Sequence, residues 1–265
     1  EARFSIGEKS VVLLDTPGHA DFSTEAERTL QVLDYAILVI SGSDGVQSHT
    51  LTIWKLLQAY NVPTFIFVNK MDQPGTDEDQ IMTQLSKEFG GGFVKFKDAE
   101  PADLEELASC SEAMMEEFFE TENVSKDKVI EGIAERKVFP VCFGSALKME
   151  GVDQLLKTVE DYTENKSYSE GFKARVYKIS RDKQGNRQTH LKITGGTLKN
   201  KMIIKGDGWE EKVEQIRLYN GKTFETAQDA SAGMICSVHG LTRTYAGQAL
   251  GEGADSDQLP MIAPA

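Results

Sequence analysis

The chain has 265 residues, of which 40% are hydrophobic and 27% charged, and it contains only 7 prolines. This composition is typical of a folded globular protein and excludes a largely disordered chain. At roughly 100–200 residues per domain, the length predicts two domains, or one domain with an appendage. The formal net charge of −13 argues at first against a nucleic-acid partner, but the charge is unevenly distributed along the chain.

The sequence contains neither membrane nor disulfide signals. No stretch approaches the ~20 apolar residues that a membrane span needs, and the first residues have no basic-then-apolar export signal, so we expect neither membrane spanning nor secretion. Cys110, Cys142 and Cys236 are far apart without a CxxC pair, and the four histidines have no HExxH spacing. We therefore expect a cytoplasmic protein in a reducing environment, with no protein-ligated transition metal.

The first 165 residues alternate short apolar runs with longer helical patterns, which predicts an α/β domain with a largely parallel sheet. Residues 2–6 are expected to pair with the first apolar run as an antiparallel hairpin. Because the runs are apolar throughout, we expect strands buried on both faces at residues 10–15, 35–41, 63–69 and 138–143. The helical patterns cover residues 23–33, 47–59 and 152–162.

An acidic helical insert is expected at about residues 98–135, which carry a net charge of −11. Within it, residues 101–122 place apolar side chains at steps of three and four, which predicts one helix with a single apolar stripe and an acidic opposite face. The paired Met114 and Met115 favour core filling. An acidic contact surface is the alternative interpretation.

The pattern changes to period two after residue 166, as in residues 172–176, where apolar and charged residues alternate. Glycine-containing turns separate such stretches, for example at Gly195-Gly196 and Asn220-Gly221. We therefore expect an all-β module, a small barrel, at residues 169–252 and an exposed linker at residues 253–265. The net charge of +4 over residues 171–265 is compatible with contacts to RNA phosphates.

Asp15 directly follows the first predicted strand and begins the run DTPGHADF, which precedes a helix. An acid at the carboxyl end of a strand can hold a metal ion through water, and a nearby glycine, here Gly18, can offer its backbone N–H to a terminal phosphate. A DxxG pattern alone is common by chance, but the longer run at a strand end is far more specific.

Asn69, Lys70, Met71 and Asp72 form an NKxD element at the end of another predicted strand. In guanine-nucleotide-binding proteins, which this element resembles, NKxD places a carboxylate where it accepts from the two N–H groups on the edge of guanine. Adenine lacks this pair of donors, and an unpaired buried carboxylate costs a few kcal/mol, so the element discriminates strongly between the bases.

Ser145, Ala146 and Leu147 follow the last predicted strand of the α/β region. Backbone N–H groups there, chiefly that of Ala146, would meet the guanine oxygen. Taken singly, a solvated aspartate, an Asn-Lys turn and a Ser-Ala helix cap are simpler interpretations of the three elements. Their order and their common place at strand ends favour one nucleotide site.

These motifs together resemble the G domain and second domain of the elongation factor G group of translational GTPases. The resemblance covers DTPGHADF, NKMD, GSAL and the barrel segment ITGGTL at residues 193–198. Within that group the chain is most similar to the tetracycline-resistance ribosomal protection proteins, because its insert is shorter than the usual one of elongation factor G. The resemblance implies a partial P-loop-type GTP-binding domain at residues 1–168, followed by the barrel.

The resemblance also implies roles for individual residues. It makes Asp15 the water-mediated ligand of Mg²⁺, Gly18 the sensor of the γ-phosphate and His19 the residue that orients the attacking water. Asn69 would brace neighbouring loops, and the stem of Lys70 would lie over the base. The implied cofactors are GTP or GDP with Mg²⁺, and the implied reaction of the intact parent is hydrolysis of GTP to GDP and phosphate.

The departures from the family pattern are equally specific. No GxxxxGK[ST] phosphate-binding loop and no first switch precede Asp15, and the Gly-Lys-Thr at residues 221–223 is predicted to be a hairpin turn. The chain thus resembles an internal piece of a larger GTPase, and we expect the piece itself to be inactive. Since the phosphate-loop strand is central in the family's sheet, its absence should leave two strands without a neighbour.

The resulting hypothesis is a fragment of a ribosome-dependent GTPase that couples hydrolysis to binding and release of the ribosome, its ribosomal RNA and its proteins. The fragment is expected to be a monomer, and residues 253–265 would lead to a further domain. The alternative is a non-catalytic ribosome-binding module or a degenerate GTPase paralogue. The sequence leaves open whether the parent protects against tetracycline or translocates tRNA.

Overall fold

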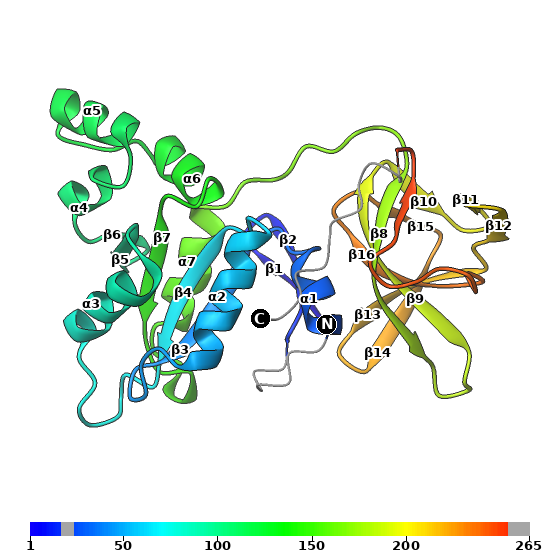
Figure 1. Cartoon of the computed structure of the whole chain (residues 1–265), viewed down its shortest axis with the longest axis horizontal. Coiled ribbons are helices and arrows are strands. Elements are labelled where there is room, and N and C mark those ends of the chain that lie inside the picture. Colours follow the sequence, from blue (N-terminus) through cyan, green and yellow to red (C-terminus); the bar gives the residue numbers. More distant parts are fainter. Residues whose placement is uncertain (17–23, 254–265) are drawn as a thin grey trace. The chain divides into compact units, whose positions relative to one another are not determined.

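The computed structural model of the chain describes residues 1–16 and 24–253, the side chains of residues 24–26 excepted. Contacts divide the chain into two compact units (Figure 1). We call Leu33–Glu164 the α/β unit, and Glu1–Val32 together with Asn165–Ala265 the β unit. Within the described ranges, no helix is both long and apolar enough to cross a membrane.

The α/β unit is built on a five-stranded sheet with the order β3-β4-β7-β5-β6. Its first four strands are parallel, and β6 is antiparallel to β5. The predicted strands at residues 35–41, 63–69 and 138–143 are confirmed, whereas the prediction missed β5. The strands are β3 (Ala36–Ser41), β4 (Thr64–Asn69), β5 (Phe93–Lys97), β6 (Glu100–Pro101) and β7 (Phe139–Phe143).

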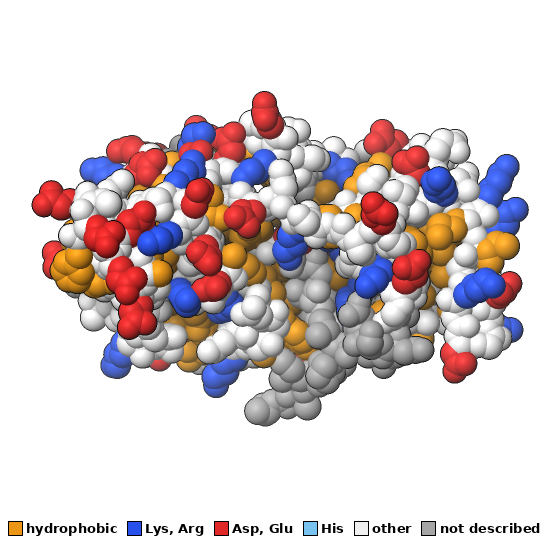
Figure 2. All heavy atoms as spheres, turned by 90° about the horizontal axis from the view of Figure 1, so that it is seen from above, with side chains coloured by type: hydrophobic (Ala, Val, Ile, Leu, Met, Phe, Trp, Pro, Cys, Tyr) orange, Lys and Arg blue, Asp and Glu red, His pale blue; other side chains and the backbone are white. Residues whose placement is uncertain are grey.

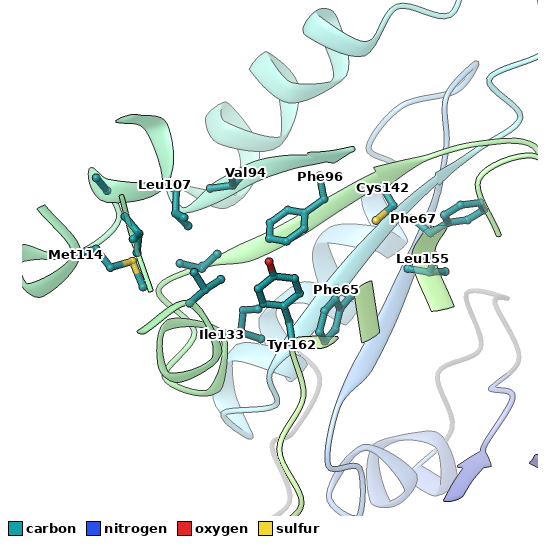
Figure 3. Packing of buried hydrophobic residues seen from close by; sticks show 14 residues of the cluster. Phe65, Phe67, Val94, Phe96, Leu107, Met114, Ile133, Cys142, Leu155 and Tyr162 are labelled. Carbon is teal, nitrogen blue, oxygen red and sulfur yellow. The ribbon is translucent and has the colours of Figure 1, made fainter. Parts of the chain in front are cut away.

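Both faces of this sheet are covered by helices, and β4 contributes side chains to the hydrophobic clusters on both faces. Its Ile66 and Val68 pack with Trp54 of α2 (Ser48–Ala59) and with residues of α3 (Glu78–Phe89). Its Phe65 and Phe67 point the other way, into a cluster with Leu155 of α7 (Val152–Asp161) (Figure 3). Each fully buried side chain of this size contributes roughly 1.5–3 kcal/mol. The apolar run of β4 is explained by burial on both faces.

The acidic insert contains three helices, α4 (Leu104–Ala108), α5 (Glu112–Thr121) and α6 (Lys126–Ala134). The prediction of one helix over residues 101–122 is therefore wrong. Ser111 caps α5 by accepting from the Met114 amide (3.2 Å), which ends the preceding helix. Met114 is 2% exposed, which confirms core filling. Figure 2 shows acidic side chains gathered over the end of the unit that carries α4 and α5.

The β unit has the predicted all-β character after residue 172. Its main sheet is antiparallel with the order β14-β13-β16-β9-β8-β17, and two further strand pairs, β10 with β15 and β11 with β12, complete it. Val176, Leu191, Ile216 and Val238 lie in its core. The main strands are β8 (Lys173–Arg181), β9 (Arg187–Gly195), β13 (Gln215–Asn220), β14 (Thr223–Ala227), β16 (Ile235–His239) and β17 (Ala249–Gly251). The pairs are β10 (Thr197–Lys199), β11 (Ile203–Gly206), β12 (Trp209–Lys212) and β15 (Asp229–Ser231).

The Gly-Lys-Thr sequence lies in the tight turn between β13 and β14. Asn220 is opposite Thr223 in the register, and Gly221 has a φ of +62°, a conformation that glycine adopts at little cost. The hairpin prediction is confirmed, and these residues do not form a phosphate-binding loop.

The first strands pack with the β unit. β1 (Ala2–Ile6) and β2 (Lys9–Leu13) form the expected hairpin, and Val12 lies against a cluster that contains Val32 and Tyr177. In the same unit, α1 (Thr24–Leu30) contacts β8. The expectation of a strand at residues 10–15 buried on both faces of a parallel sheet is wrong, because the described β2 pairs with β1 alone and Leu13 is 45% exposed.

β2 and β3 belong to two different sheets. β3 is the edge strand of its sheet, and its Ile37 and Val39 are 38% and 56% exposed. A family sheet that lacks its phosphate-loop strand is expected to leave β2 and β3 each without one neighbour. The two compact units defined by contacts differ from the two domains expected from the sequence, which meet at residue 168. The domain boundary at residue 168 therefore stays a proposal.

Candidate functional site

The predicted base-recognition residues lie in two loops at one edge of the α/β sheet. β4 ends at Asn69 and β7 ends at Phe143, and the strands are parallel neighbours with Val68 opposite Phe143. Their carboxyl ends therefore lie side by side, and residues 69–72 meet residues 144–148 there. Ligands of open α/β proteins commonly bind at this edge of the sheet.

Backbone hydrogen bonds fix the two loops to each other. The Gly144 amide donates to the Val68 carbonyl (2.9 Å), and the Met71 amide donates to the Gly144 carbonyl (3.0 Å). A Cβ atom on Gly144 would overlap the carbonyl oxygen of Glu150. The glycine that begins the GSAL sequence is thus required by close approach of the backbone, independently of any ligand.

Asn69 joins the loops through its side chain. Its Oδ1 accepts hydrogen bonds from the amides of Lys70 and Ala146, both at 2.8 Å. Lys70 is exposed and has a φ of +65°, so the chain turns sharply at this point. The Ala146 N–H, which the sequence predicts to meet a guanine oxygen, is therefore donated to Asn69 in this structure.

Asp72 is the acidic group of the two loops. Its Oδ2 lies 3.7 Å from Nζ of Lys148. The nearby Ser145 hydroxyl and the Lys148 ammonium lower the pKa of the Asp72 carboxyl below its ordinary value, which keeps it charged near neutral pH. Ser145 is 1% exposed, and no described atom meets the full hydrogen-bond geometry for its Oγ. An ionised carboxylate only accepts hydrogen bonds, so Asp72 suits a ligand with N–H donors.

The loop after β7 continues as a short 3₁₀ helix, η1 (Ala146–Lys148). It is closed by two backbone hydrogen bonds between Ser145 and Glu150, at 2.9 Å and 3.0 Å. Leu147 on η1 is 91% exposed, and Met149, which follows with a φ of +59°, is 67% exposed. Both apolar side chains belong to the turn that carries Lys148, the partner of Asp72.

Sequence reasoning missed Lys148 and a third loop. The Gly42 amide, after β3, donates to the Asn69 carbonyl (2.7 Å), and a Cβ on Gly42 would overlap the sulfur of Met71. Lys148 directly follows GSAL in the sequence, but its pairing with Asp72 depends on contacts between distant parts of the chain. Gly42, directly after β3, was a weak sequence signal for this close packing.

The predicted phosphate-side residues lie elsewhere in the chain. Asp15 is exposed, two residues beyond the end of β2 in the β unit, while Gly18 and His19 lie outside the described residues. Among described side chains, no group of three His, Cys, Asp or Glu could hold a metal ion. A single exposed carboxylate nevertheless fits Mg²⁺, which keeps several waters and binds through one or two carboxylates together with substrate phosphates.

Two family models match the chain. The elongation factor Tu GTP binding domain matches residues 1–165, and elongation factor G domain 2 matches residues 171–253. A protein from Thermus thermophilus with a solved crystal structure superimposes with a TM-score of 0.82 at 20% identity, covering 98% of this chain and 47% of that one. The comparison confirms the expected fold, an α/β GTPase-type domain followed by a β-rich domain.

Curated relatives support the same grouping. Tetracycline resistance protein TetP of Clostridium perfringens is 30% identical over 277 residues, which cover 94% of this chain and 42% of that protein. Elongation factor G of Ureaplasma urealyticum serovar 10 is 28% identical, with coverage of 91% and 45%. The chain therefore spans less than half the length of these relatives.

Proposed function

The chain belongs to the family of the elongation factor Tu GTP binding domain, and from this premise we propose that it is part of a GTPase that acts on the ribosome. The observation that carries the proposal is the joining of NKMD and GSAL at neighbouring strand ends, with Asn69 bonded to Ala146. The alternative of a non-catalytic module or degenerate paralogue is not favoured by these matches.

In the proposed site, guanine is recognised by two groups of this chain. The Asp72 carboxylate accepts from the two N–H groups on the edge of the base, and the Ala146 amide turns from Asn69 to the guanine oxygen. The stem of Lys70 covers one face of the base. Adenine offers the wrong donors to Asp72, and a desolvated carboxylate without a partner is costly, so the site selects guanine.

The hydrolytic part of the proposal concerns Asp15, Gly18 and His19. Asp15 would hold a water of the Mg²⁺ ion, and the Gly18 amide would contact the terminal phosphate. His19 would orient the water that attacks it. Bound Mg²⁺ neutralises charge on the phosphates, and catalysis comes from positioning and electrostatic stabilisation. The phosphate-binding loop would come from a part of the parent outside this sequence.

The barrel at residues 169–252 is the proposed ribosome-binding part. Residues 171–265 carry a net charge of +4, in contrast to −13 for the whole chain. Such a bias supports contacts with ribosomal RNA and proteins, because a phosphate backbone attracts cationic surfaces. We place the parent in the cytoplasm and the fragment in solution as a monomer. The names of the relatives support either elongation or tetracycline protection as the cellular role.

The base site can be tested on the chain as it exists. Guanosine carries the base without phosphates, so its binding is independent of a phosphate loop. Titration followed by NMR should give shifts at Asp72 and Ala146 with guanosine and not with adenosine. In Asp72→Asn the preference should move towards xanthosine, because an amide offers a donor where xanthine has a carbonyl. Equal shifts with adenosine, or an unchanged preference in the variant, would contradict the proposed function.

A further inference from the structure

The acidic group of the base site already has a partner within the chain. Nζ of Lys148 lies 3.7 Å from Oδ2 of Asp72, and the side chains are 51% and 18% exposed. The pair joins loops that are 76 positions apart in the sequence. Lys148 is the last residue of η1, and its amide donates to the Ser145 carbonyl (3.1 Å), which fixes the start of its side chain close to the carboxylate.

The second base-facing group is engaged as well. The Ala146 amide is bonded to Asn69 Oδ1, so both groups proposed to read guanine have partners inside the protein. A base that donates two N–H groups to Asp72 needs both carboxylate oxygens turned towards it. The ammonium of Lys148 therefore competes with the base for Oδ2, one of these two oxygens.

We propose that Lys148 is a positioning residue that holds Asp72 before a guanine base binds and must withdraw as the base enters. The inference rests on the proposed guanine site and deepens it by naming the group that sets the affinity for the base. Lys148 has two opposing effects on the binding of the base. It keeps the carboxylate charged and oriented before binding, and it lowers affinity because its ion pair is lost when the base enters.

The size of the effect follows from the exposure of the pair. A surface ion pair at this distance has a modest strength, which corresponds to about two- to fivefold in a binding constant. Removing the ammonium should thus tighten binding of the base by this factor. The effect should fall at high ionic strength, because salt screens the pair in the unmodified chain.

The test compares guanosine binding by the full chain and by Lys148→Ala, Lys148→Arg and Lys157→Ala, measured by NMR titration. Lys157 is a matched control, because it is 55% exposed and pairs with Glu160 and Asp161 on α7. Guanosine is uncharged, so the substitutions do not change an attraction to phosphate. We expect two- to fivefold tighter binding for Lys148→Ala, and unchanged binding for Lys148→Arg and Lys157→Ala.

A second readout follows the Asp72 carboxyl by NMR as a function of pH. Its titration should move upwards in Lys148→Ala and stay in place in Lys157→Ala, which a purely structural role of Lys148 would not produce. Unchanged or weaker guanosine binding by Lys148→Ala, or an unmoved Asp72 titration, would overturn the inference alone. Absence of guanosine binding in every protein, including the unmodified chain, would overturn the proposed base site and the inference with it.

Discussion

Asn69 Oδ1 accepts a hydrogen bond of 2.8 Å from the amide of Ala146, 77 positions further along the chain. The same oxygen accepts the Lys70 amide at 2.8 Å. One side-chain atom thus holds one residue from each of the two base-site loops, Lys70 and Ala146. The two loops are held together by contacts within the chain, and this brace depends on an acceptor at position 69.

Replacing that acceptor should loosen the site. In Asn69→Ala two hydrogen bonds are lost, each worth about 0.5–1.5 kcal/mol, so we expect the α/β unit to lose roughly 1–3 kcal/mol of unfolding free energy. Asn69→Asp keeps an acceptor and should retain most of it. Urea unfolding followed by Trp54 fluorescence in a Trp209→Phe background measures the difference. Equal unfolding free energies for Asn69→Ala and the unmodified chain would show that the brace is dispensable.

Gly144 provides a second test of the same site. A Cβ atom at this position would overlap the Glu150 carbonyl oxygen and press on the ring of Phe67. Gly144→Ala should therefore destabilise the α/β unit by about 1–3 kcal/mol, as overpacking does, and displace η1. Gly91→Ala is the matched control, since a Cβ there has open space around it. Similar unfolding curves for the two variants would mean that the loop adjusts freely.

The sequence predicts the central strands and the site loops better than the edges of the fold. β4 is apolar throughout because both its faces are buried, and NKMD and GSAL follow strands whose parallel pairing brings their ends together. β5 escapes the same reasoning because Lys95 interrupts its apolar pattern. In the structure the Lys95 ammonium forms ion pairs with Glu78 and Asp79 at the start of α3, both at 3.0 Å, so its charge is directed away from the strand.

Other differences depend on long-range contacts or on single caps. The break between α4 and α5 follows from the Ser111 cap. This cap is a local signal, but the prediction of one helix relied on the apolar periodicity instead. The apolar run at residues 10–15 does not reveal that β2 pairs with β1 alone, in a two-stranded sheet of its own. The pairing of Lys148 with Asp72 has no signature in spacing, because the two residues meet only through the neighbouring strands β4 and β7.

Nucleotide binding by the chain itself should be weak. The sequence contains no GxxxxGK[ST], and in related sites the amides and lysine of that loop hold the β- and γ-phosphates and Mg²⁺. We expect poor affinity for GTP with Mg²⁺ and negligible hydrolysis, because the base contacts remain while the phosphate contacts are missing. Isothermal titration calorimetry measures this directly. A low-micromolar dissociation constant would contradict the prediction and require another phosphate site.

A buried histidine makes the β unit sensitive to acid. His239 is 9% exposed, and its Nε2 lies 3.3 Å from Nε2 of Gln188, which donates to it in the neutral state. Burial, followed by the nearby Arg217 guanidinium, lowers the pKa of His239 below its ordinary value of about 6.5. The unfolded chain therefore binds this proton more readily than the folded one. Stability should fall as pH drops below about 6.5 and stop falling below the lowered pKa.

The slope of that loss identifies the group responsible. One proton bound only in the unfolded state changes the unfolding free energy by up to about 1.4 kcal/mol per pH unit. His239→Gln should flatten the dependence below about pH 6.5, whereas His49→Gln, at an exposed position, is the control. Urea unfolding followed by Trp209 fluorescence in a Trp54→Phe background gives the profile. An equally steep profile in His239→Gln would assign the acid sensitivity to other groups.

The remaining prediction concerns His19, which belongs to the DTPGH sequence and lies outside the described residues. Its proposed task is to orient the attacking water, which affects the transition state and not the binding of GTP in the ground state. In the parent protein with its phosphate-binding loop, His19→Ala should leave GTP affinity nearly intact. Ribosome-stimulated hydrolysis should fall by about 10²–10⁴-fold, the effect typical of a positioned catalytic side chain.

Single-turnover hydrolysis with and without ribosomes separates the two effects, with GTP affinity measured in parallel. Asp15→Asn is an informative comparison, because a residue that holds a water of the Mg²⁺ ion should change nucleotide affinity as well as rate. If His19→Ala keeps its ribosome-stimulated rate, or loses rate only in proportion to GTP affinity, then His19 does not orient the water. The proposed roles of Asp15 and Gly18 at the phosphates would stand independently of that result.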